Sequence, residues 1–205
     1  MNATWKVLPV LLGMLPLAGI AAPGDEDFAA GKAALVRGAG MGREGSSDAG
    51  AAYARFLAAA RAGHPEAMDA VGMMLVGGRG VARDTAAGVD WLRRSAAAGN
   101  PRAHYSLGLM AAAGRHLAKD PGAAVAHWQV AAAAGHAGAA YRLALASLRG
   151  EGVVRDDGAA REWLARAADR GAPEARALIE GHGCAGPDLV LAGSEEGRGG
   201  DHGAP

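Results

Sequence analysis

Cysteine, aromatic residues and an excess of either charge are all scarce in this chain. It has one cysteine among 205 residues, and only 4% of its residues are aromatic. A single cysteine excludes an internal disulfide, which leaves Cys184 as a free thiol or as half of an intermolecular bond. Lysine plus arginine and aspartate plus glutamate number 21 each, so no basic surplus points to nucleic acid and no acidic run to a charged tail.

Small residues are abundant instead. Hydrophobic residues make up 50% of the chain, many of them alanine, and there are 33 glycines. Alanine favours helices because it loses no side-chain entropy there, whereas frequent glycine works against long uninterrupted helices. The composition therefore predicts short, alanine-rich helices separated by glycines.

The N-terminal residues 1–22 have the pattern of a secretory signal peptide. Lys6 precedes an apolar stretch over residues 7–17, and small residues follow, so cleavage is expected after Ala21 or Ala22. The apolar stretch is shorter than the roughly 20 residues that a membrane-spanning helix needs. We therefore expect a periplasmic or secreted protein that meets a membrane only through a partner. An uncleaved anchor, or a scaffold retained in the cytoplasm, remains the alternative.

A repeat of 36 residues organises the middle of the chain. Three consecutive copies align from end to end, a fourth stops after one helix, and Phe28 to Gly63 form a degenerate copy in the same register. The glycine-rich C-terminal segment has scattered charges and is predicted to be disordered. The predicted organisation is a signal peptide over 1–22, a degenerate repeat or cap over 23–63, a solenoid over 64–181 (repeats 64–99, 100–135 and 136–171 and a half repeat 172–181), and a tail over 182–205.

Each copy predicts two helices. In the first copy the earlier helix runs from about Pro65 to Val76, and the later one begins near the capping residue Asp84. Each full copy has one tryptophan, but that of the middle copy is displaced by one residue, or about 100° around its helix. We expect local repacking around it. The residues expected to be structural are Gly72, Trp91, Gly108, Trp128 and Trp163.

The sequence offers no catalytic or metal-binding pattern. The glycine-rich turn from Gly77 to Val81 lacks the spacing of a phosphate-binding loop, and it recurs as a turn in every copy. None of the seven histidines forms an i, i+4 pair with an acidic partner on a helix. We therefore predict no catalytic residues, no metal and no cofactor, and a protein that is not an enzyme.

The pattern of residues that recurs in the three copies resembles the Sel1-like repeat, a relative of the tetratricopeptide repeat. The first copy has the pattern in Ala67, Val71-Gly72, Gly78-Arg79-Gly80-Val81, Asp84, Ala87, Trp91, Ala96 and Gly99. The third copy repeats most of it, but Leu75, Ala111 and Ser147 stand where the family usually has a tyrosine. The resemblance implies an all-α fold, a right-handed αα-superhelical solenoid. It also implies an adaptor or regulator in the cell envelope that binds a protein or peptide.

The same resemblance suggests which residues face a partner. In helix-pair solenoids the first helices line a concave surface. An apolar groove with two tyrosines would suit a peptide or helix, although the alternative is that these residues pack between repeats as core. A second possible function is an envelope hydrolase acting on a β-lactam or peptidoglycan fragment, but the cysteine pairs of such relatives and the S-x-x-K motif are missing. The predicted partner-facing residues are Asp69, Met73, Tyr105, Leu109, Tyr141 and Leu145.

Overall fold

The computed structural model describes residues 22, 24–40 and 46–181, and within these ranges all regular secondary structure is helical. The predicted signal peptide, the predicted disordered tail and Cys184 therefore lie outside the described residues. No helix of the described part is long and apolar enough to cross a membrane. In chain order the helices are α1 (Asp25–Gly40), α2 (Ser46–Arg61), α3 (Pro65–Gly77), α4 (Thr85–Ala97), α5 (Pro101–Ala113), α6 (Pro121–Ala133), α7 (Ala137–Arg149), α8 (Asp157–Asp169) and α9 (Pro173–Gly181).

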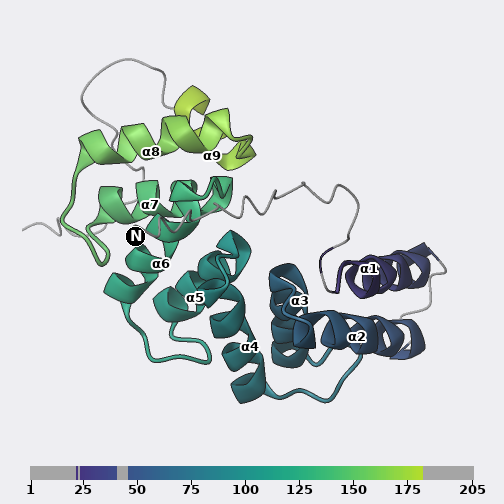
Figure 1. The fold of residues 1–205 in the computed structure, drawn as a ribbon. Coiled ribbons are helices and arrows are strands. Elements are labelled where there is room, and N and C mark those ends of the chain that lie inside the picture. The colour runs from purple at the N-terminus through teal and green to yellow at the C-terminus, as the bar shows by residue number, and fades with distance from the viewer. Residues whose placement is uncertain (1–21, 23, 41–45, 182–205) are drawn as a thin grey trace, which may run out of the picture.

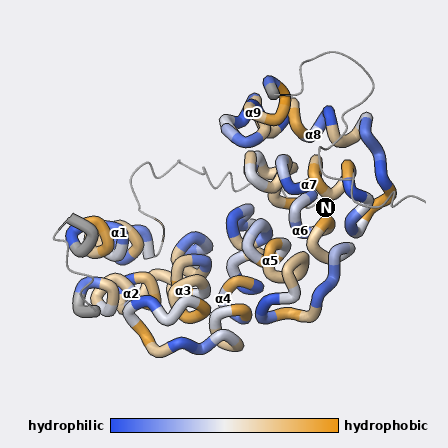
Figure 2. Tube along the Cα trace, turned by 180° about the vertical axis from the view of Figure 1, so that it is seen from behind, coloured by the Kyte–Doolittle hydropathy of each residue, from blue (hydrophilic) through white to orange (hydrophobic). Residues whose placement is uncertain are grey.

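The helices form consecutive pairs that stack into a solenoid. The first helix of each pair packs mainly on the second helix of the same pair, and the second helix packs on the first helix of the next pair. The stack is curved, with α3, α5 and α7 on its inner side and α4, α6 and α8 on its outer side (Figure 1). The connection between α5 and α6 is coloured as hydrophilic in Figure 2, in keeping with its place on the surface. The predicted all-α solenoid is confirmed.

Local sequence signals set the helix ends. The Oδ1 atoms of Asp84, Asp120 and Asp156 each accept a hydrogen bond from the backbone N–H three residues on, at 2.9–3.0 Å, so the predicted caps of the second helices are confirmed. The first helices α3 and α7 are capped by histidine side chains, those of His64 and His136. Each complete first helix ends at a glycine in the left-handed conformation, with φ between 65° and 68°.

Small residues let the two helices of a pair come close together. A Cβ atom added at Gly72 would lie 2.8 Å from Cγ of Leu92, and one added at Gly108 would lie 2.4 Å from Nε1 of Trp128. Leu92 and Trp128 are 36 residues apart, so Trp128 fills the position that leucine holds in the first repeat. The displacement read from the sequence thus places this tryptophan in the core, where 7% of its surface is exposed.

The other two tryptophans lie differently. Trp91 and Trp163 are half-buried, with one side against the core and the other under a guanidinium group. Cζ of Arg94 lies 5.0 Å from the centroid of the Trp91 ring, and Cζ of Arg166 lies 4.7 Å from that of Trp163. A tryptophan therefore contributes its full area to the core only in the middle repeat.

The degenerate N-terminal copy departs from the expected register in its first helix. A Cβ atom at Gly31 would lie 2.6 Å from the ring of Phe56, so Gly31 faces Phe56 as Gly72 faces Leu92. Phe56 stands one period before Leu92, which places α2 in register. From Gly31 to Phe56, however, the chain is five residues longer than from Gly72 to Leu92. The prediction that the copy from Phe28 to Gly63 keeps the 36-residue register is therefore wrong for α1. The additional residues lie within α1 and α2, which are longer than α3 and α4.

Candidate partner-binding face

The six residues predicted to face a partner lie on the three first helices α3, α5 and α7, and by their sequence positions they form two rows, one at Asp69, Tyr105 and Tyr141 and one at Met73, Leu109 and Leu145. Met73 is exposed over 43% of its surface, whereas Asp69 is buried at 3%. Tyr105, Leu109 and Tyr141 are half-buried and pack against the core, and Leu145 is half-buried as well. The predicted residues are therefore mostly apolar and range from buried to exposed. Both tyrosine side chains are partly exposed to solvent.

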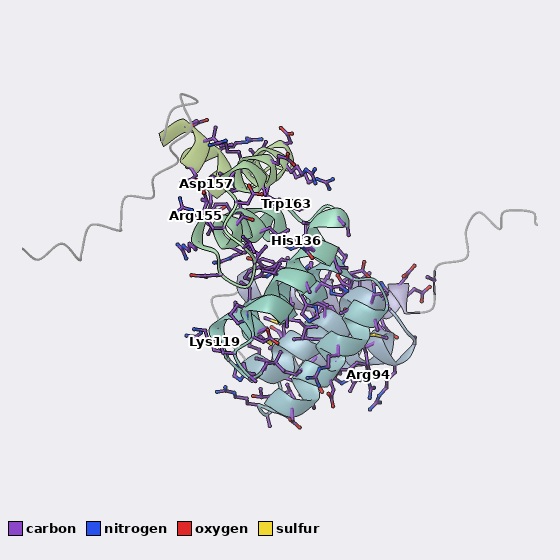
Figure 3. All side chains as sticks on the ribbon, turned by 90° about the vertical axis from the view of Figure 1, so that its left-hand side faces the viewer. Arg94, Lys119, His136, Arg155, Asp157 and Trp163 are labelled. Carbon is purple, nitrogen blue, oxygen red and sulfur yellow. The ribbon has the colours of Figure 1, made fainter. Side chains whose placement is uncertain are left out.

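The first row joins neighbouring repeats. The Tyr105 ring stacks on the imidazole of His136, with centroids 4.4 Å apart and planes inclined by 24°. His136, which lies at the start of α7 (Figure 3), accepts the backbone N–H of Ala139 on Nδ1 at 3.2 Å. Tyr105 therefore packs on the residue that caps the first helix of the next repeat, so one of its faces is already occupied.

Phe28 belongs to the same row, although sequence reasoning missed it. Its ring lies 4.3 Å from the imidazole of His64, which caps α3 as His136 caps α7. Phe28 precedes Gly31 by three residues, as Tyr105 precedes Gly108. The five additional residues of the N-terminal copy hid this equivalence. A search for a glycine three residues after an aromatic residue would have found it.

Asp69 occupies the row position of the first full repeat. Its Oδ2 lies 3.6 Å from Nε of Arg102, at the start of α5, while its Oδ1 is buried with no hydrogen-bond partner. Burial raises the pKa of this carboxyl above its ordinary value, Arg102 acts in the opposite direction, and Glu66 raises the pKa further. A buried acceptor oxygen that lacks a hydrogen-bond partner lowers the stability of the fold.

A pocket of about 240 Å³ opens beside Asp69. Its walls come from α1, α2, α3, the turn after α3 and the start of α5. The aromatic and aliphatic part of the wall includes Phe28, Leu35, Phe56 and Met73. The pocket is thus mainly apolar with a carboxylate at one side, which is typical of a site for an organic side chain or small ligand.

Three cations also line this pocket. They are Lys32, Arg79 and Arg102. Nζ of Lys32 lies 4.6 Å from the centroid of the Phe28 ring, and the Arg102 side chain is 72% exposed beside Asp69. Sequence reasoning found none of them as site residues, because the pocket depends on how the first pair stacks on the second.

The second helices carry a different polar pair. His127 takes the place that Trp91 and Trp163 hold in the other repeats, and its Nδ1 lies 3.0 Å from Nδ1 of His104. Burial and the neighbouring His104 lower the pKa of His127 below its ordinary value of 6.5. The described residues contain no group of three or more histidine, cysteine, aspartate or glutamate side chains that could hold a metal ion.

These observations define a class: a solenoid of helix-pair repeats, each of which touches only its neighbours. The Sel1 repeat model matches residues 65–100, 101–136 and 137–171. These matches cover more than half of the chain, which belongs to the Sel1 repeat family. Proteins of this family generally mediate interactions between proteins.

Solved structures show the same fold. The Sel1 repeat protein from Oxalobacter formigenes is 28% identical with a TM-score of 0.61, over 64% of this chain and 53% of that one. The protective antigen c5321 of uropathogenic Escherichia coli is 27% identical with a TM-score of 0.66, over 78% and 34% respectively. This chain thus spans about half the length of one and a third of the other.

A more distant structure shares the fold alone. Helicobacter pylori cysteine rich protein B is 17% identical with a TM-score of 0.50, over 56% of this chain and 88% of that one. A comparison with curated proteins gives no match.

Proposed function

We propose that this protein is an adaptor or regulator of the cell envelope that binds a peptide or helix of a partner protein on the inner side of the solenoid. The observation that carries the proposal is the row Met73, Leu109 and Leu145, which presents apolar surface along three first helices. Met73 is exposed over 43% of its surface, and it belongs to α3, a helix on the inner side of the curved stack (Figure 1). Such a surface suits the apolar face of an amphipathic segment.

The envelope location rests on the signal-peptide pattern of residues 1–22 and is tested separately. N-terminal sequencing of the exported protein should give a chain that starts after Ala21 or Ala22. A full-length N-terminus recovered only from the cytoplasm would contradict this part of the proposal. That result would not contradict the proposed binding surface.

The binding surface is tested with two matched substitutions. Met73→Lys places a charge on the inner side, and Val130→Lys places the same charge on α6, where Val130 is 49% exposed. The mature protein and both variants are used to capture partners from the native envelope, after circular dichroism shows equal melting temperatures. We expect Met73→Lys to lose the captured partner and Val130→Lys to retain it. Equal capture by the two variants would refute binding on the inner side.

A further inference from the structure

Asp69 differs in chemistry from the residues at the equivalent positions of the other repeats. Phe28, Asp69, Tyr105 and Tyr141 each stand three residues before the small residue that faces the second helix of their pair. Three of these four positions are aromatic. The rings at 28 and 105 each pack against a capping histidine of the next first helix. Only in the first full repeat is the ring replaced by a short carboxylate.

The pocket lies where this ring is missing. Its volume of about 240 Å³ is bounded by Asp69 and Met73 of α3 and by Phe28 of α1. A ring from outside the chain could therefore contact the apolar wall that a ring at position 69 would otherwise cover. The carboxylate of Asp69, one oxygen of which has no hydrogen-bond partner, supplies an acceptor group at the wall of the pocket.

The charged residues that line the pocket restrict the kind of ligand that it can bind. Lys32, Arg79 and Arg102 outnumber the two carboxylates of Glu66 and Asp69, so a cationic ligand would be repelled. The face of an aromatic ring attracts cations instead, as the ring of Phe28 already attracts Lys32. A neutral aromatic group with an O–H or N–H donor suits both the apolar wall and the carboxylate of Asp69.

We propose that this pocket binds a tyrosine or tryptophan side chain of the partner, with its O–H or N–H donating to the carboxylate of Asp69. The inference rests on the proposed function, because it names the side chain that the inner surface recognises. Asp69 is then a residue that sets specificity at some expense to stability, since an aromatic residue there would complete the row and close the pocket.

The test uses three small probes: the N-acetyl amides of tyrosine, phenylalanine and lysine. Each is titrated into the isotope-labelled full chain, and the shifts of the Asp69, Ala70 and Met73 backbone amide signals are followed by NMR. We expect the tyrosine probe to bind about tenfold more tightly than the phenylalanine probe, because the two differ only by the hydroxyl that bonds to a charged acceptor. Equal binding of these two, no binding of either, or tighter binding of the lysine probe would overturn the proposal.

Variants locate the effect. Asp69→Tyr should fill the pocket and abolish binding of the tyrosine probe, and Asp69→Leu should remove the preference for tyrosine over phenylalanine. Asp90→Leu is the matched control, because Asp90 lies on α4 and its side chain is 63% exposed. We expect the melting temperatures of both Asp69 variants to equal or exceed that of the native chain, since a buried carboxylate with a poorly satisfied oxygen is lost. The comparison of probes on the native chain needs no variant, so misfolding of one would not remove the test.

The inference and the proposed function fail separately. If the native chain shows no preference for the tyrosine probe but Met73→Lys still abolishes capture, the aromatic site is wrong and the inner binding surface stands. If the tyrosine probe binds at Asp69 while Met73→Lys captures the partner normally, the pocket is correct and its place in partner binding is wrong.

Discussion

The contact between Gly108 and Trp128 gives the sharpest test of how this solenoid packs. A Cβ atom at Gly108 would lie 2.4 Å from Nε1 and 2.6 Å from Cδ1 of the Trp128 ring, which is almost fully enclosed. Gly108→Ala should cost up to about 3 kcal/mol by overpacking. It should recover about 1 kcal/mol from the better helix propensity of alanine. The expected net destabilisation is therefore about 1–2 kcal/mol.

A second substitution removes the indole ring of Trp128. Trp128→Leu leaves a cavity that should cost about 2–4 kcal/mol. It also removes a buried indole N–H that has no hydrogen-bond partner, which should return about 1 kcal/mol. The third repeat shows that the smaller pair is compatible with the fold, because Ala144 and Leu164 hold these two positions there.

The double variant Gly108→Ala, Trp128→Leu tests whether the two residues are in contact. Once Trp128 is leucine, Gly108→Ala meets no ring, so it should be neutral or stabilise by about 1 kcal/mol. The cost of Gly108→Ala thus disappears or changes sign between the two backgrounds, a coupling of about 1–3 kcal/mol. Urea unfolding followed by circular dichroism measures each free energy. Each kcal/mol should also shift the melting temperature by about 2–4 °C. Equal effects of Gly108→Ala in both backgrounds would refute the proposed packing.

The remaining predictions concern exposure, backbone strain and pH. Trp91→Ala should cost about 1–2 kcal/mol, below the about 3–5 kcal/mol expected for the enclosed Trp128, because Trp91 is half-buried; equal losses in urea unfolding would contradict this difference. His116 has a φ of 66°, where the other two full repeats have glycine, so His116→Gly should stabilise the protein by up to about 1 kcal/mol, and a lower melting temperature would refute it. Burial lowers the pKa of His127 and His136 below 6.5 in the folded protein, so the unfolded chain binds more protons as the pH falls. Their contribution to stability is complete above pH 6.5 and is lost progressively below it, whereas the raised pKa of Asp69 acts in the opposite direction at more acidic pH. The urea midpoint should therefore fall between pH 7.5 and 5.5, and replacing both histidines with glutamine should reduce that fall; an unchanged pH dependence would contradict the assignment.

The amino-acid sequence by itself determined the repeat, the helices and their caps. These features are local: a proline at the first helical position, an aspartate whose carboxylate accepts an N–H three residues on, and a glycine that adopts positive φ at the end. The displacement of Trp128 by one residue was also readable, because rotation around a helix follows from residue number alone. The family followed from the same local pattern in three copies.

Only the tertiary structure decided what the inner side can bind. The pocket beside Asp69 is formed by residues of α1, α2, α3 and the start of α5, which are far apart in the sequence. The burial of Asp69 and the partial exposure of Trp91 depend on the side chains that neighbouring helices place against them. A period fixes which positions recur along the chain. What each position touches is decided by the neighbouring repeat, and here the repeats differ.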